Sequence, residues 1–133
     1  MATVGAALVS RLESCPGLVA LVGTDIYRVE VNEGTSPPYV VLNFAPTERY
    51  SAFGEDTGAA HVDWRARCFG STLKQAEDVR EQVRSALQRW RGTQRGVTFD
   101  DVVLTPGDTE PDRDFDTQLM FVELTGRAYF KET

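Results

Sequence analysis

The sequence predicts an α+β fold: a mainly antiparallel β-sheet with one long helix and a short N-terminal helix packed on one face. Three observations predict it. Several short segments alternate between apolar and polar residues, which is the period of a strand. Residues 71–91 carry an apolar stripe at helical spacing. Most predicted strands follow one another without a helix between them, which favours antiparallel pairing. The 133 residues fit a single domain spanning 1–133.

Two helices are predicted on one face of that sheet. Val4, Leu8 and Leu12 recur at intervals of four residues, and Thr3 can cap the helix that they form. A second short apolar turn follows and closes at Gly23. The long helix over 71–91 begins with a capping box. Its apolar stripe consists of Ala76, Val79, Val83, Ala86, Leu87 and Trp90.

Five segments are predicted as strands: 26–31, 39–44, 61–69, 97–104 and 118–130. Segment 39–44 is apolar at nearly every position, which is typical of a central strand covered on both faces. Segment 61–69 alternates, so one of its faces meets the core and the other meets water or a partner. The alternation of 97–104 changes phase at Asp100 and Asp101, which predicts a bulge. Residues 49–58 resemble a hairpin excursion.

Composition excludes several classes of function. No apolar run approaches ~18 residues, so neither a membrane span nor a membrane partner is expected. The N-terminus lacks the basic cluster of a signal peptide, so we expect a protein made in the cytoplasm. The net charge of −6 repels phosphates, so DNA is expected only in passage. Cys15 and Cys68 belong to no CxxC pair and are expected to be free, buried thiols.

The chain lacks the residue sets of common catalytic sites. Its single histidine, His61, lies on the polar face of a predicted strand, and no GxSxG elbow surrounds a serine. A surface or interface role is therefore preferred for His61. One histidine and two isolated cysteines do not give the ligand spacing of a zinc site. The sequence predicts no enzyme, no cofactor and no metal; a hydrolase or transferase remains the weakest alternative.

An acidic loop over 105–117 is the most conspicuous polar feature. Asp112, Asp114 and Asp116 occupy alternate positions, and Glu123 falls where an EF-hand loop has its bidentate glutamate. Thr117 stands where that loop needs glycine, and an alternating strand follows in place of the exiting helix. The pattern favours a charged binding loop. A small ligand- or calcium-binding module remains an alternative.

The order of features along the chain resembles a known family. An apolar turn, a Pro-Pro strand, an alternating strand, a long helix and an acidic segment follow one another before a long last strand. The residues that carry the resemblance are 21–27, 37–42, 68–70, 75–79, 83–87 and 112–117. Over about residues 8–130 this order is similar to the tail completion, or tail terminator, proteins of long-tailed bacteriophages and gene transfer agents. The long acidic loop over 105–117 departs from that pattern.

The resemblance implies a structural role in the virion. Members of that family form a ring, typically a hexamer, at the head-proximal end of the tail tube. The ring ends polymerisation of the tube and offers a docking surface to the head connector. The implied partners are therefore other copies of this chain, the tail tube protein and a head completion or connector protein, with DNA passing through the lumen. A head-side connector or neck adaptor, also a small ring subunit, is the alternative.

A ring gives a possible use to the charged residues that one core does not need. Contacts in a cyclic ring are heterologous, so two different surfaces of each subunit must be complementary. We expect a basic face on one side of the subunit to meet an acidic segment of its neighbour. The basic residues of this hypothesis are Arg65, Arg67 and Arg127, and the acidic ones are Asp108, Glu110, Asp112, Asp114 and Asp116.

Overall fold

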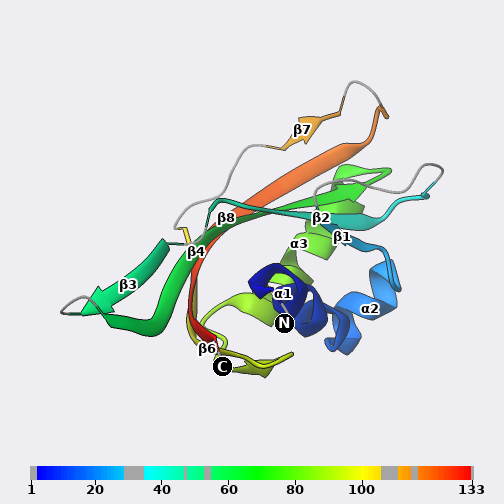
Figure 1. Ribbon diagram of the computed structural model, residues 1–133. Helices are drawn as coiled ribbons and strands as arrows, with labels where there is room; N and C mark the ends of the chain where they lie inside the picture. The colour runs from blue at the N-terminus through cyan, green and yellow to red at the C-terminus, as the bar shows by residue number, and fades with distance from the viewer. Residues whose placement is uncertain are drawn as a thin grey trace.

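A strongly curved β-sheet dominates the structure, with helices on its concave side (Figure 1). The structure is a computed structural model that describes residues 3–28, 35–46, 48–52, 55–105, 111–114 and 117–132. Within these residues the sheet has eight strands. Six of them follow the order β1-β2-β4-β8-β6-β5, while β3 pairs with β4 and β7 pairs with β8. The strands are β1 Ile26–Arg28, β2 Tyr39–Phe44, β3 Glu48–Ala52, β4 Glu55–Gly70, β5 Gly92–Gln94, β6 Val97–Leu104, β7 Asp112–Arg113 and β8 Met120–Glu132.

The antiparallel pair β4–β8 forms the spine of the sheet and runs through its full curvature (Figure 1). β2 lies along the second half of β4, where Phe44, the last residue of β2, pairs with Trp64. β6 lies along the second half of β8, where Leu104, the last residue of β6, pairs with Gly126. Trp64 and Gly126 pair with each other. Both flanking strands therefore end at the same point of the spine, which we call the bend.

Three helices cover the concave side: α1 Val4–Glu13, α2 Pro16–Val22 and α3 Leu73–Leu87. As predicted, the Thr3 side chain caps α1 by accepting from the Ala6 N–H. The Thr72 hydroxyl likewise accepts from the Gln75 N–H at 3.2 Å. Among the described residues no single helix is long and apolar enough to cross a membrane; α1 and α2 meet that condition only as a pair bent by 88°.

The core lies between these helices and the inner face of the spine. The predicted stripe of α1 is buried there, and so is that of α3 as far as Leu87. The alternate residues of β4 that the sequence assigned to the core are buried too, together with Val122, Leu124, Ala128 and Phe130 of β8. Burial of this apolar surface is the dominant favourable term in folding. Fully buried side chains of the core include Leu8, Leu12, Leu42, Val79, Val83, Val102 and Phe130.

The fold-class prediction is wrong about the sheet. The sheet is mixed, because β1 pairs with β2 in parallel, with Ile26 opposite Val40 and Arg28 opposite Leu42. The prediction assumed that strands joined without a helix must pair antiparallel. The connection over residues 29–38, however, is long enough for the chain to return to the end at which β1 began before β2 starts. A parallel pair needs such a crossover of roughly a dozen residues, whether or not it is helical.

The prediction of one long helix over 71–91 is also wrong. The structure has three short helices, and α3 ends at Leu87 after 15 residues. Arg89 adopts a positive φ of 58°, and its N–H donates to the Val102 carbonyl of β6 at 2.8 Å. Backbone contact with a neighbouring strand thus replaces the last helical turn. Trp90 belongs to no helical stripe; its ring packs on Phe99 at 4.9 Å between ring centroids.

Two finer predictions for the strands are confirmed. The register of β6 against β8 shifts between Phe99 and Asp101, which is the expected bulge. β2 is covered on both faces: Val40 and Leu42 face the main core, while Tyr39 and Val41 face outward. The outward pair belongs to a second, smaller cluster with Tyr27, Phe69, Leu119 and Phe121. The outer face is therefore apolar at one end and polar elsewhere.

Candidate functional site

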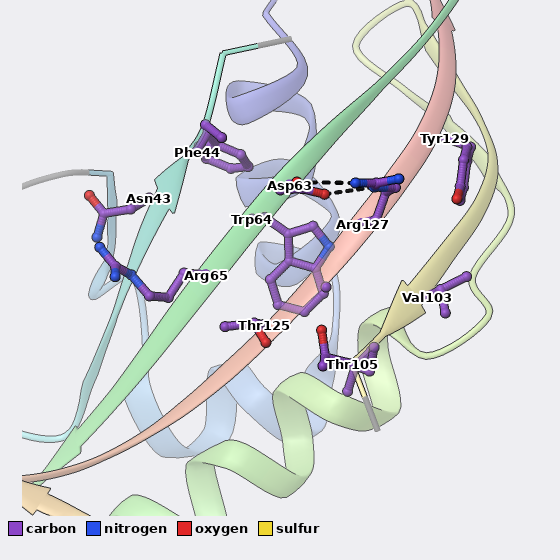
Figure 2. Close-up of a pocket in the computed structure, with 13 residues that line it drawn as sticks. Asn43, Phe44, Asp63, Trp64, Arg65, Val103, Thr105, Thr125, Arg127 and Tyr129 are labelled. Atoms are coloured by element: carbon purple, nitrogen blue, oxygen red, sulfur yellow. Dashed lines mark hydrogen bonds and ion pairs between the residues drawn. The ribbon is translucent and has the colours of Figure 1, made fainter. Parts of the chain in front are cut away.

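A cavity of about 790 Å³ lies at the bend, and four neighbouring strands line it. We call it the bend cavity. β2, β4, β8 and β6 each contribute a short run of residues centred on Phe44, Trp64, Gly126 and Leu104. Asp63 and Arg65, on either side of the buried Trp64, are exposed, as expected for strand residues on the face away from the helices. The bend cavity therefore opens on the outer face of the sheet (Figure 2).

Gly126 allows the sheet to pack this closely at the bend. A Cβ atom at this position would stand 2.6 Å from Cζ2 of Trp64 and would also clash with the Val103 carbonyl oxygen. The indole of Trp64 is 2% exposed and fills the inner side of the bend. Because one of the two obstacles is backbone, it cannot move aside as a flexible side chain would. A residue with a side chain is therefore excluded at 126.

Arg127, one of the three predicted basic residues, has a partner in its own chain. Arg127 Nε donates to Asp63 Oδ1 at 2.7 Å, and Arg127 Nη2 donates to Asp63 Oδ2 at 3.3 Å. Figure 2 shows this pair bridging β8 and β4 at the edge of the bend cavity. The hydrogen bond from Arg127 is the main cause that lowers the pKa of Asp63 below its ordinary value; burial opposes it. Arg127 therefore offers a neighbour little unpaired charge.

The other two arginines share one carboxylate. Arg67 Nε lies 3.0 Å from Glu123 Oε2 and donates a hydrogen bond to it, whereas Arg65 Nε lies 3.8 Å from the same oxygen. The Arg67 guanidinium also sits over the Phe121 ring at 5.1 Å. The Arg65 side chain is 46% exposed and lines the bend cavity. Of the three predicted arginines, Arg65 is the one with the weakest contact to an acid.

The acidic segment is described only in part. Asp112 lies in β7, on the exposed surface, where its carboxylate accepts from the Arg113 N–H at 2.7 Å. Asp114 is half-buried beside the outer apolar cluster; burial first, and the charge of Asp114 second, raise the pKa of Tyr39. Three further members of the predicted set, Asp108, Glu110 and Asp116, lie outside the described residues.

The remaining polar candidates take structural positions. His61, expected at the surface or an interface, is 7% exposed and lies beside the Tyr129 ring, so that prediction is wrong. Glu123 engages the two arginines from within β8 instead of closing a calcium loop. Both cysteines are free; Cys68 is buried and Cys15 is half-buried. In the part of the chain that is described, no three His, Cys, Asp or Glu side chains gather as metal ligands.

Sequence reasoning missed the bend cavity itself. The sequence gives the identity of every lining residue, but it does not give the point along the spine at which β2 and β6 end, and the cavity depends on that point. The only available signal was Gly126, an isolated glycine in a predicted strand, which often marks a bend or a close backbone approach.

The fold and this surface define a class: a small α+β protein with one curved sheet, whose bend cavity holds paired charges. Comparisons with known proteins then identify the family. Residues 6–131 match the model of the tail completion protein gp17 family. The chain belongs to that family, whose members are structural proteins of bacteriophage tails, and its location is the virion. The resemblance inferred from the order of sequence features is confirmed.

A solved structure shares the fold. A chain from the virion of a native gene transfer agent particle matches with a TM-score of 0.72 and 22% sequence identity. The match covers 95% of this chain and 92% of that chain. A search of curated proteins gave no match.

Proposed function

We propose that the protein is the tail completion subunit that forms a closed ring at the head-proximal end of the tail tube. The ring ends polymerisation of the tube and offers a docking surface to the head connector. The observation that carries this proposal is the family match over residues 6–131, which spans nearly the whole chain.

The structure supports a role in contact rather than in chemistry. The bend cavity holds the Asp63–Arg127 ion pair and Arg65, and its lining includes no histidine or cysteine. Two side chains that could take part in catalysis, His61 and Cys68, are both buried and do not line the bend cavity. The fold similarity to a chain of a gene transfer agent virion is consistent with assembly among other virion proteins.

The proposal is tested with the purified protein and the tube protein of the same phage. Tube subunits polymerise alone or with the protein added at increasing ratio, and electron microscopy measures tube length. We expect tubes to stop growing, with the protein bound at one end. Tubes of unchanged length, with the protein instead bound to the isolated portal or connector, would assign it to the head side. Size-exclusion chromatography with light scattering, with and without tubes, gives the ring size.

Contacts within the ring are proposed to pair the basic face with the acidic segment of a neighbour. The acidic set is Asp108, Glu110, Asp112, Asp114 and Asp116, and the basic set is Arg65, Arg67 and Arg127. Changing Asp112, Asp114 and Asp116 together to lysine should weaken the ring in native mass spectrometry. An intact ring would refute this contact while leaving the tube assay as the test of the function.

A further inference from the structure

We propose that the bend cavity is the socket of the subunit contact, and that Asp112 of a second copy binds Arg65 there. This inference rests on the proposed ring and names its contact. It selects one arginine of the three predicted and one described carboxylate of the acidic segment. The bend cavity supplies the concave surface, and the exposed β7 strand supplies the part that enters it.

Arg65 is chosen because its charge is the least compensated of the three. Arg127 makes two hydrogen bonds with Asp63, and Arg67 holds Glu123 at 3.0 Å. Arg65 reaches the same Glu123 oxygen only at 3.8 Å, so two guanidinium groups share one carboxylate. A guanidinium can bind a carboxylate with two parallel hydrogen bonds, and within the described residues Arg65 makes no such pair. The wall of the bend cavity thus favours an added carboxylate.

Asp112 is chosen because it is fixed on the surface, far from its own Arg65. β7 pairs Asp112 with Phe121 of β8, while Arg65 pairs with Thr125 on the other side of β8. The offset of four positions along β8, with two strand spacings sideways, puts the two Cα atoms roughly 17 Å apart. An aspartate and an arginine side chain do not span that distance. Asp112 can reach Arg65 only in another molecule.

Size and charge of the bend cavity agree with a strand-like occupant. A volume of about 790 Å³ accommodates a short extended segment but not a second domain. Tyr129, 36% exposed, adds an aromatic surface to the wall. Two arginines and one aspartate line the cavity, whereas the chain as a whole has a net charge of −6. The contact joins two different surfaces of one chain, which is the arrangement that closes rings.

Disulfide trapping tests the contact directly. Arg65→Cys and Asp112→Cys are made separately in a Cys15→Ser background, where the remaining Cys68 is buried. Under mild oxidation we expect a disulfide-linked dimer when the two variants are mixed, and monomers when either is oxidised alone. The double variant should give a ladder of covalent oligomers. An intramolecular bond is excluded in it, because a disulfide needs Cα atoms within about 7 Å.

A matched control replaces another exposed aspartate, Asp100 of β6, with cysteine and mixes that variant with Arg65→Cys. We expect no covalent dimer from this mixture. Equal cross-linking by Asp100→Cys would overturn the proposal, because it would show that any surface thiol traps Arg65→Cys by collision.

Exchange of the two charges gives a second readout. Arg65→Asp and Asp112→Arg should each reduce the ring population at least tenfold in native mass spectrometry, and the double exchange should restore it. If the ring persists in both single variants, the contact is wrong although the proposed function stands. If the wild-type protein forms no ring, alone or on tubes, the proposed function itself fails. Both residues are exposed, so circular dichroism should show folded variants throughout.

Discussion

The two faces of the β4–β8 spine differ in their surroundings: the side chains of one face are buried, and those of the other form ion pairs that remain in contact with water. On the inner face Val62, Trp64, Ala66 and Cys68 are almost fully buried against helices. On the outer face Asp63, Arg65 and Arg67 keep part of their side chains in water and pair across strands. Each face is made by alternate residues of the same strand, so one strand supplies both buried apolar side chains and exposed charged ones. We expect substitutions on the inner face to change stability and substitutions on the outer face to change assembly.

The largest effect should come from Gly126, where the inner face is tightest. Gly126→Val forces a side chain against the Val103 carbonyl and the Trp64 indole. We expect a loss of at least about 3 kcal/mol in the free energy of unfolding, or failure to fold. Urea unfolding followed by tryptophan fluorescence measures it. The matched control is Thr125→Val, a near-isosteric change on the outer face, which should cost less than about 1 kcal/mol. Similar losses for both variants would abolish the distinction between the faces.

An intermediate effect is expected from Cys68, at alkaline pH. Burial raises the pKa of the Cys68 thiol to about 12, although the charge of Arg80 opposes the shift. The unfolded thiol ionises near its ordinary value of 9.0. The stability that this thiol contributes is therefore complete below pH 9 and lost as the pH rises from 9 towards 12. The loss attributable to the thiol should approach roughly 1 kcal/mol per pH unit in that window.

Cys68→Ala isolates this contribution of the inner face. The variant is less stable at neutral pH because it leaves a small cavity. Its stability should nevertheless fall less steeply than that of the wild type between pH 9 and 12. Chemical denaturation at a series of pH values gives both slopes. Parallel slopes would mean that the thiol ionises as easily in the folded protein as in the unfolded chain.

The smallest effect is expected from the Asp63–Arg127 pair on the outer face. The Arg127 hydrogen bond lowers the pKa of Asp63, so the pair stabilises the fold above the ordinary aspartate pKa of 3.8. That contribution disappears as the pH falls below this value through the lowered pKa. Both side chains are about half exposed, so solvent screens the pair strongly. Asp63→Asn should shift the thermal midpoint only slightly at pH 7, and not at all at strongly acidic pH.

High salt gives the check on this pair. Because exposed charges are screened, the small difference between wild type and Asp63→Asn should vanish in 1 M salt, where the screening length is about 3 Å. A large and salt-independent difference would show that Asp63 supports the fold in another way, for example through packing at the bend.

The sequence predicted local structure well where the cause is local. Thr3 and Thr72 cap helices because a hydroxyl next to free N–H groups needs no distant partner. The buried side of β4 followed from alternation, and the bulge of β6 followed from the change of phase at Asp100 and Asp101. The predictions failed where contact with another element of the fold decides the end of a helix or the direction of a strand. α3 stops at Leu87 because the backbone beyond it bonds to β6, and β1 runs parallel to β2 because the chain returns before pairing.

Sequence alone determined the family, the inner face of the sheet and the residue types available for contact. Those properties depend on the order of the segments, the spacing of apolar residues and the positions of charged residues, all of which can be read from the sequence. Only the tertiary structure decided which of the three arginines is paired least closely with a carboxylate of its own chain. Arg65, Arg67 and Arg127 look alike on alternating strands, yet the register of β4 against β8 sets Asp63 beside Arg127 and Glu123 beside Arg67. Register, and the point at which two flanking strands end, arise from packing between distant segments.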